Sequence, residues 1–392
     1  MRRRLHPLWL ALALLVLAVL ALPFMLDTAP GRRLLAQNLP RLELASGLSF
    51  RVTRIDGSLW GKATLHGITA HDQNGAFATI DRLDLDWHPL ALAYNQFVAD
   101  SISIPRARLT RLPILKPSKD PRLLPAQDII IGRFALGRLD LAAGIAGPPR
   151  AITASGRTDI RAGRAVVLLD ARALGDGDRL HLDLDAEPDR DRFALTARLD
   201  APAGGIVTTL AGFKRPLTAT ASCRGRWRTW AGNVQAGFAG VTAPLADLAI
   251  SGRGGQLRAD GRIDPAQLLT GPAARLLAGG LALTAEAAPD GDIARLSLNV
   301  NGNAISGMAR GRLNRSSERL SDTQARLVLA DNAAQARELG IGGLVITAKA
   351  AGPLLAPVID ARTTARSLQL AGSTPLRLDG LTLAFITKCI TK

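Results

Sequence analysis

Apolar and charged residues alternate one for one from Leu83 to Trp87. Successive side chains of a β-strand point to opposite faces. Leu83, Leu85 and Trp87 would therefore share one face of a strand, and Asp84 and Asp86 would share the other. This alternation is typical of a strand that is half-buried, with one face against apolar material and one in water.

Three later segments repeat the alternation, clearly at residues 180–185 and 296–301 and more weakly at 326–329. Together they predict a mainly β fold: an elongated, curved, one-sided antiparallel sheet that forms a groove, with a short capping helix. The apolar residues expected to line the groove are Leu83, Leu85, Trp87, Leu182, Leu184, Leu296, Leu298 and Val300.

The composition favours many short strands. Of the 392 residues, 47% are hydrophobic but only 4% are aromatic, and there are 38 glycines and 22 prolines. Buried surface would therefore come from aliphatic side chains, and turns would be frequent. We expect about twenty strands, with Phe50–Ile55, Ile206–Gly212 and Arg224–Trp230 among them and Asp379–Gly380 as one of the turns.

The formal net charge of +16 raises nucleic acid as a partner. Arginine supplies almost all of the positive charge, however, and the arginines are spread along the predicted strands. In Arg224–Trp230, alternate positions would place three arginines on the outer face of a strand and Trp227 on the inner face. On the outer face the arginines would attract anionic lipid headgroups. We expect no nucleic acid partner. Two cysteines are too few for a disulfide framework.

The N-terminus predicts an uncleaved membrane anchor. Arginines occupy positions 2–4, and Leu8–Leu26 carries no charge. As a helix this segment would be about 28 Å long, close to the thickness of the bilayer hydrocarbon. No small-residue cleavage site follows, so we expect a single-pass inner-membrane protein with a cytoplasmic N-terminus and a periplasmic bulk. The anchor residues are Leu8, Leu12, Leu15, Val19 and Leu26.

The rest of the chain divides at a proline-rich stretch and at a helix-like stretch that begins near Pro265 and is interrupted at Gly271. Because the last strand has no following partner, we expect a truncated chain. The predicted divisions are 1–7 leader, 8–26 anchor, 28–45 juxtamembrane helix capped by Thr28, 46–115 N-terminal β-region, 116–128 linker, 129–263 β-groove, 264–280 short broken helix, 281–386 continued groove and 387–392 aberrant tail.

The motifs that would indicate an enzyme are missing from the sequence. The histidines and cysteines lack metal-ligand spacing, and no phosphate loop or nucleophile elbow occurs. Asp176–Asp178 resembles the opening of a calcium loop but lacks the later ligands, so a turn is favoured. We therefore expect no catalytic residues, no metal, no cofactor and no enzymatic activity.

The N-terminal sequence resembles that of the TamB family, which is related to the AsmA-like envelope proteins. The resemblance lies in three segments, Ile55–Gly61, Leu65–Ile68 and Ile80–Leu90. The order resembles that family too: an anchor, a short helix, a G-S-L-x-G turn at Gly57–Gly61 and an L-x-L-x-W strand. Gly352–Ile359 looks like its recurrent G-x-L-x-x-P-x-x unit. The resemblance covers only the N-terminal portion of a typical member, without the domain that faces the outer membrane.

The resemblance implies a U-shaped β-groove in the Gram-negative periplasm. Its function would be phospholipid transfer between the inner and outer membranes, outer-membrane protein assembly, or both. Phospholipids and the inner membrane are the implied partners, and an Omp85-type outer-membrane protein is a partner by resemblance alone. From the residues themselves we infer an exported, anchored, one-sided sheet. The alternative is an anchored structural or interaction module that conducts no lipid.

Overall fold

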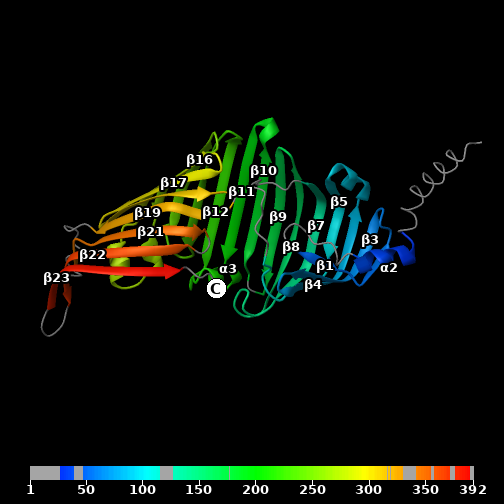
Figure 1. Cartoon of the computed structure of the whole chain (residues 1–392), viewed down its shortest axis with the longest axis horizontal. Coiled ribbons are helices and arrows are strands. Elements are labelled where there is room, and N and C mark those ends of the chain that lie inside the picture. The colour runs from blue at the N-terminus through cyan, green and yellow to red at the C-terminus, as the bar shows by residue number, and fades with distance from the viewer. Residues whose placement is uncertain are drawn as a thin grey trace, which may run out of the picture. The chain divides into compact units, whose positions relative to one another are not determined.

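Alternating apolar and polar residues make most of the chain extended. The computed structural model describes residues 27–38, 47–114, 127–175, 177–315, 317, 319–329, 341–354, 357–370 and 376–388. The fold is mainly β, with mixed sheet and few short helices (Figure 1). It has two compact units. The first ends at Gly175, and the second runs from Asp176 and also takes in residues 117–123 and 163–166.

The first unit carries β1 to β9. Its elements are α2 (Ala29–Asn38), β1 (Ser49–Arg51), β2 (Arg54–Gly57), β3 (Lys62–Asp72), β4 (Gly75–Trp87), the 3-10 helix η2 (Pro89–Tyr94), β5 (Gln96–Ile104), β6 (Ala107–Leu109), β7 (Asp128–Leu141), β8 (Arg150–Arg161) and β9 (Arg164–Leu174).

The prediction of a purely antiparallel sheet is wrong in this unit. Strand β7 pairs in parallel with β5 and with β6. Parallel neighbours need a connection of about a dozen residues or more, and residues 110–127 supply it. The sheet is therefore mixed, and the unit continues beyond the predicted linker at 116–128, since β7 begins at Asp128.

The segment predicted as one strand, Phe50–Ile55, is divided between β1 and β2. Both pair with β3, and between them the Thr53 hydroxyl donates to the carbonyl of Gly67 at 3.1 Å. Gly67 has φ +59°, and a Cβ there would lie 2.5 Å from the Thr53 hydroxyl oxygen. The local irregularity thus requires glycine.

Helix α2 covers the first strands of this unit. The Thr28 hydroxyl accepts a hydrogen bond from the backbone N–H of Gly31 at 3.4 Å, in the manner of an N-cap. On the sheet side, buried Ala36 packs with Val52, which lies between β1 and β2, with Ile55 of β2, and with Ala63 and Ile68 of β3. This small core holds the helix on the sheet.

The second unit carries β10 to β23. Its elements are β10 (Arg179–Glu187), η3 (Pro188–Arg190), β11 (Arg192–Ala201), α3 (Ile206–Leu210), β12 (Leu217–Arg226), β13 (Thr229–Phe238), β14 (Ala246–Arg253), β15 (Gln256–Ile263), η4 (Pro265–Leu268), α4 (Pro272–Leu276), β16 (Leu281–Asp290), β17 (Ile293–Gly302), β18 (Ile305–Asn314), β19 (Arg319–Leu329), β20 (Ile341–Gly342), β21 (Val345–Pro353), β22 (Val358–Leu370) and β23 (Leu376–Lys388).

Three local predictions fail in the second unit. Ile206–Gly212 is not a strand, because helix α3 occupies Ile206–Leu210. Arg224–Trp230 is not one strand, because a turn at Trp227 and Arg228 joins β12 to β13, and Trp227 is exposed. Asp379–Gly380 is not a turn but lies within β23. In the last two cases the pairing of neighbouring strands, which the local sequence does not record, decides the conformation. In the first case Asp178, 28 positions away in the chain, accepts the N–H of Ile206 at the start of the helix.

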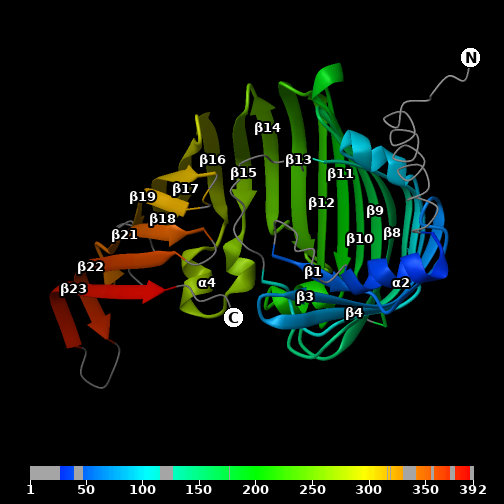
Figure 2. The ribbon, with the colours of Figure 1, turned by 45° about the vertical axis from the view of Figure 1, so that its right-hand side comes forward.

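Residues 264–280, predicted as a short helix broken near Gly271, hold two short helices, η4 and α4. Gly271 separates them with φ +67°, a conformation that favours glycine. Leu276 of α4 packs on buried Ala304 and Leu329 at the ends of β18 and β19. Figure 2 shows α4 beside the strand ends of this unit.

Several predictions fall on residues that the structure does not describe. The anchor at Leu8–Leu26, with Leu8, Leu12, Leu15, Val19 and Leu26, lies outside the described residues, as does most of the linker and the end of the tail. Within the described residues, no helix combines the length and apolar character needed to cross a bilayer.

Candidate functional site

Two rows of small and aliphatic residues cross the strands of the second unit. Directly opposed residues of paired strands lie on the same face, so the register defines each row. The first row is Leu182, Ala197, Ala221, Val234, Leu248, Gly261, Leu283, Val300, Gly307, Leu327 and Ile346.

The second row runs beside the first, two residues along each strand. It consists of Leu184, Leu195, Cys223, Gly232, Ile250, Ala259, Ala285, Leu298, Ala309, Ala325, Ala348 and Ala361. Neither row contains a charged or hydrogen-bonding side chain other than the Cys223 thiol. We call the two rows together the apolar face.

The opposite face of the same strands is polar. The row that begins at Asp183 continues through Thr196, Ser222, Asn233, Ala249, Asp260, Thr284, Asn299, Met308, Arg326 and Thr347. Segregation of the two kinds of side chain therefore persists from β10 to β21. A register slip of one residue would bring the polar side chains to the apolar face.

Most of the apolar face is only half-buried. Along both rows, Cys223 is buried, Leu298 is 37% exposed and the remaining side chains are intermediate. The core of a two-layer sandwich would bury these positions, because a second layer would interdigitate with them. Among the described residues of this unit, nothing forms such a layer over the middle of the face.

The clusters of buried residues in the described part of this unit lie at the strand ends. At one end, Ala201, Leu217 and Phe238 are buried, and the partly buried Val207 of α3 and Phe213 pack against them. The Phe213 and Phe238 rings meet edge to face at 5.5 Å. Leu276 of α4 closes the ends of β18 and β19 in the same way. These helices thus bound the apolar face without covering its middle.

Aromatic rings gather at the other strand end. The Phe193 ring lies 4.8 Å from that of Trp230 and 6.0 Å from that of Trp227, measured between centroids. Trp230 extends over Gly252, where a Cβ would lie 2.4 Å from the indole. Both ends of the strands between β11 and β14 therefore carry aromatic contacts, whereas the middle carries small and aliphatic residues.

The five predicted groove residues of the second unit all lie on apolar rows. Leu182 and Val300 belong to the first row and Leu184 and Leu298 to the second, while Leu296 lies in the next row, opposite Ala287 and Gly311. Val234, Leu248, Ile250 and Ala259 were missed. Alternation was present in β13 to β15, but glycine and alanine at the inward positions weakened its signal.

The three predicted residues of the first unit have different surroundings. Leu83 packs against the core that α2 closes. Leu85 faces Ile102 of β5, and Trp87 stacks at an angle on Phe97 with ring centroids 6.0 Å apart. The buried indole N–H of Trp87 has no hydrogen-bond acceptor in the described part of the chain.

Carboxylates on strand faces are paired with arginines. Arg258 donates to both oxygens of Asp260, at 2.5 and 2.8 Å, and also pairs with Glu286. These hydrogen bonds raise the pKa of Arg258 and lower that of Asp260. Burial opposes ionisation of Asp84, but hydrogen bonds from Arg82 and Thr64 outweigh it and lower its pKa. Such fully ionised pairs are poorly suited to proton transfer near neutral pH.

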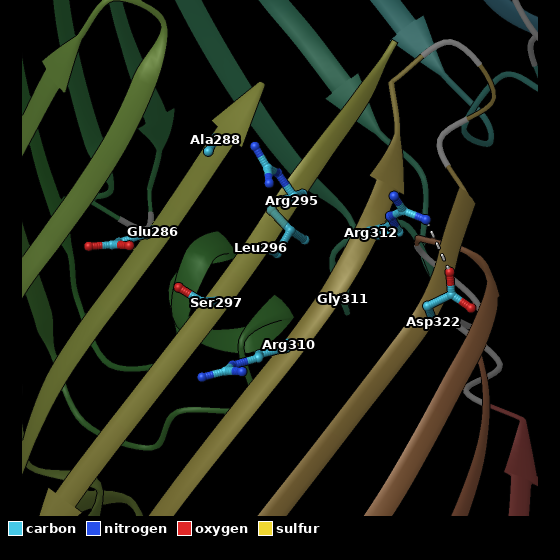
Figure 3. Close-up of a pocket in the computed structure, with 9 residues that line it drawn as sticks. All are labelled: Glu286, Ala288, Arg295, Leu296, Ser297, Arg310, Gly311, Arg312 and Asp322. Atoms are coloured by element: carbon cyan, nitrogen blue, oxygen red, sulfur yellow. Dashed lines mark ion pairs between the residues drawn. The ribbon is translucent and has the colours of Figure 1, made fainter. Parts of the chain in front are cut away.

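A shallow hollow of about 530 Å³ lies across β16 to β19 (Figure 3). Arg312 pairs there with Asp322 at 3.7 Å. Figure 3 shows the guanidinium groups of Arg295, Arg310 and Arg312 pointing in different directions. These three guanidinium groups therefore do not converge on one point where they could bind the same ligand atom. Its lining residues are Glu286, Ala288, Arg295, Leu296, Ser297, Arg310, Gly311, Arg312 and Asp322.

Asp178, considered above as a calcium ligand, caps α3 instead. Its buried carboxylate accepts the backbone N–H groups of Ile206 at 2.8 Å and Val207 at 3.3 Å. Over the residues that the structure describes, no three His, Cys, Asp or Glu side chains are grouped to hold a metal ion.

Comparison of the chain with protein-family models, curated proteins and solved structures finds no match.

Proposed function

We propose that this protein is a non-enzymatic scaffold whose apolar face binds the acyl chains of phospholipids. In this proposal residues 8–26 anchor it in the inner membrane and the strands lie in the periplasm. The elongated, curved groove, the transfer of phospholipid between membranes and the assistance to outer-membrane protein assembly are the finer parts of the proposal. They follow from the resemblance to the TamB family, as does an Omp85-type partner.

The observation that carries the proposal is the half-exposed apolar face. At about 4.8 Å per strand, the rows between β10 and β22 extend roughly 50 Å. Soluble monomers rarely expose an apolar patch of more than a few hundred Å². A face of this extent favours a lipid or a protein partner, because water contact along it is costly.

The side chains of the rows favour lipid over a protein layer. Leu, Val and Ile alternate irregularly with Ala and Gly, so the surface has unequal depth from strand to strand. A protein layer must match such a surface closely to reach native packing density. Flexible acyl chains fill unequal depth without fixed complementarity, and the absence of charge from both rows suits them.

Photo-crosslinking in a Gram-negative host tests this function. A benzophenone amino acid at Leu182 or Val300 should capture phospholipid, which mass spectrometry of the purified protein would identify. The matched positions Asp183 and Asn299 are neighbours in sequence on the opposite face, so they should capture none. Capture of protein alone at the apolar positions would favour the interaction module, and equal lipid capture on both faces would refute a specific lipid surface.

A fusion tests the proposed location separately. A reporter that is active only in the periplasm, joined after Ile386, should be active and should sediment with membranes. Recovery of a shortened, soluble periplasmic fusion would refute the uncleaved anchor while leaving the lipid-binding test unaffected.

A further inference from the structure

Four large side chains are exposed at one strand end of the first unit. The exposed fractions are 39% for Trp60, 70% for Leu90, 44% for Leu92 and 80% for Tyr94. Leu90, Leu92 and Tyr94 belong to η2, in which no residue is buried. We call these four residues the η2 surface. Its exposure is unexpected because apolar side chains in a short connecting helix commonly turn toward the sheet.

Strand pairing places the four residues at the same end of the unit. Trp60 lies in the turn before β3, and the backbone N–H of Trp87, the last residue of β4, donates to the carbonyl of Gly61 at 3.2 Å. Since η2 follows β4 at once, it begins beside that turn. In Figure 1, η2 is the cyan helical turn at the end of β5, between β4 and β5 in the chain.

The η2 loop is held in a defined conformation. Asn95 closes it in the left-handed region with φ +58°, and its N–H donates to the carbonyl of Leu92 at 3.0 Å. The Asn95 carbonyl in turn accepts the N–H of Asp128 at 3.1 Å. The exposed side chains are therefore presented by a fixed loop.

The residue that follows the uncharged segment Leu8–Leu26 in the sequence lies at this same place. Asp27, the next residue, accepts the hydroxyl of Ser58 at 2.8 Å and the N–H of Leu59 at 2.7 Å. The hydrogen bond from Leu59 contributes most to lowering the pKa of Asp27, so its carboxylate stays charged. Asp27, the residue that directly follows the proposed anchor in the sequence, is thus tied to the turn that carries Trp60.

We propose that the η2 surface is a membrane contact that seats the first unit on the phospholipid bilayer. The inference rests on the proposed membrane anchor. Trp and Tyr favour the membrane interface, where an apolar ring meets polar headgroups, and Leu90 and Leu92 would enter the acyl region. Nearby polar groups are paired and would remain at headgroup level. The Lys62 ammonium lies 3.6 Å from the Asp86 carboxylate, and the His88 ring lies 3.1 Å from the Asp100 carboxylate.

Fluorescence quenching of the full chain in vesicles tests the contact. In a Cys223→Ala, Cys389→Ala background, bimane would be attached at Leu90→Cys or Tyr94→Cys. The control is Leu112→Cys, because Leu112 is also exposed, at 64%. It lies at the opposite strand end, next to Arg111, which pairs with Asp72. The vesicles contain phosphatidylethanolamine and phosphatidylglycerol, with bromine on part of the acyl chains.

Brominated lipid should quench bimane at positions 90 and 94 at least threefold more than at 112, and aqueous iodide should show the reverse order. Equal quenching at all three positions, in protein that still floats with the vesicles, would overturn the contact and leave the anchor intact. If bimane at positions 90 and 94 is shielded from both quenchers, the η2 surface contacts a protein partner, and the proposed membrane contact is overturned too. Failure to float would refute the anchor and this contact together, whereas lipid capture at the apolar face is measured independently.

Discussion

Phe238→Ala should open one end of the second unit, because Phe238 belongs to closed packing rather than to the half-exposed apolar face. Its side chain is 4% exposed, lies edge to face against Phe213 and has the Arg215 guanidinium carbon 4.7 Å from its ring centroid. Removal of a buried phenylalanine costs about 3–5 kcal/mol. By contrast, Leu248→Ala removes a half-buried side chain from the first row, at a cost of about 1 kcal/mol.

Hydrogen exchange measured by mass spectrometry on the lipid-free chain would compare the two variants. A loss of about 3 kcal/mol corresponds to more than a hundredfold faster exchange, and about 1 kcal/mol to roughly fivefold. The amides to follow are those of β11 to β13 for Phe238→Ala and of β13 to β15 for Leu248→Ala. Equal effects in both variants would mean that the apolar face is closed like a core, and the argument for an open lipid-binding surface would fail.

Three further outcomes are expected. Asp72 is held ionised by Arg111, whose two guanidinium nitrogens each lie 2.6 Å from a carboxylate oxygen of Asp72, and the pKa of Asp72 is far below the usual range. The ionised Asp72 therefore stabilises the fold above about pH 4, and this stabilisation is lost at lower pH. The difference in thermal stability between wild type and Asp72→Asn should narrow below about pH 4, and a difference that stays constant with pH would contradict the pairing. Asp178→Ala removes the cap of α3 and should cost about 0.5–2 kcal/mol, seen as faster amide exchange in α3; unchanged exchange would show that the cap is dispensable. Leu184→Asp should lower the denaturant midpoint clearly, by placing a charge on the apolar face, whereas Asp183→Ser should change stability by at most about 0.5 kcal/mol; equal sensitivity would contradict the assignment of faces.

The alternation of residues was sufficient to predict a mainly β protein and the facing of particular side chains. Leu182, Leu184, Leu298 and Val300 were assigned to one face from local sequence, and the register places them in two adjacent rows. This succeeded because the two-residue period of a strand is a local property of the backbone. The break at Gly271 was readable for a similar reason, since glycine and proline act on their own dihedral angles.

The parallel pairing of β7 and the helix at Ile206–Leu210 were not readable from the local sequence. Both depend on residues distant in the chain: β7 pairs with β5 across a long connection, and Asp178 caps α3 from 28 positions away. Trp227 likewise occupies a turn because β12 and β13 pair at that point. Local propensity does not contain such information, and tertiary contacts override it.

The sequence by itself determined that one side of the sheet is apolar, because side-chain chemistry and strand period together fix the faces. Whether that side is buried was decided by the tertiary structure alone. Short helices close the strand ends at Phe238 and Leu329, while the middle of the apolar face stays half-exposed. The physical reason is that burial depends on which elements come to lie over a face, and an apolar residue has the same identity in a closed core and on an open surface.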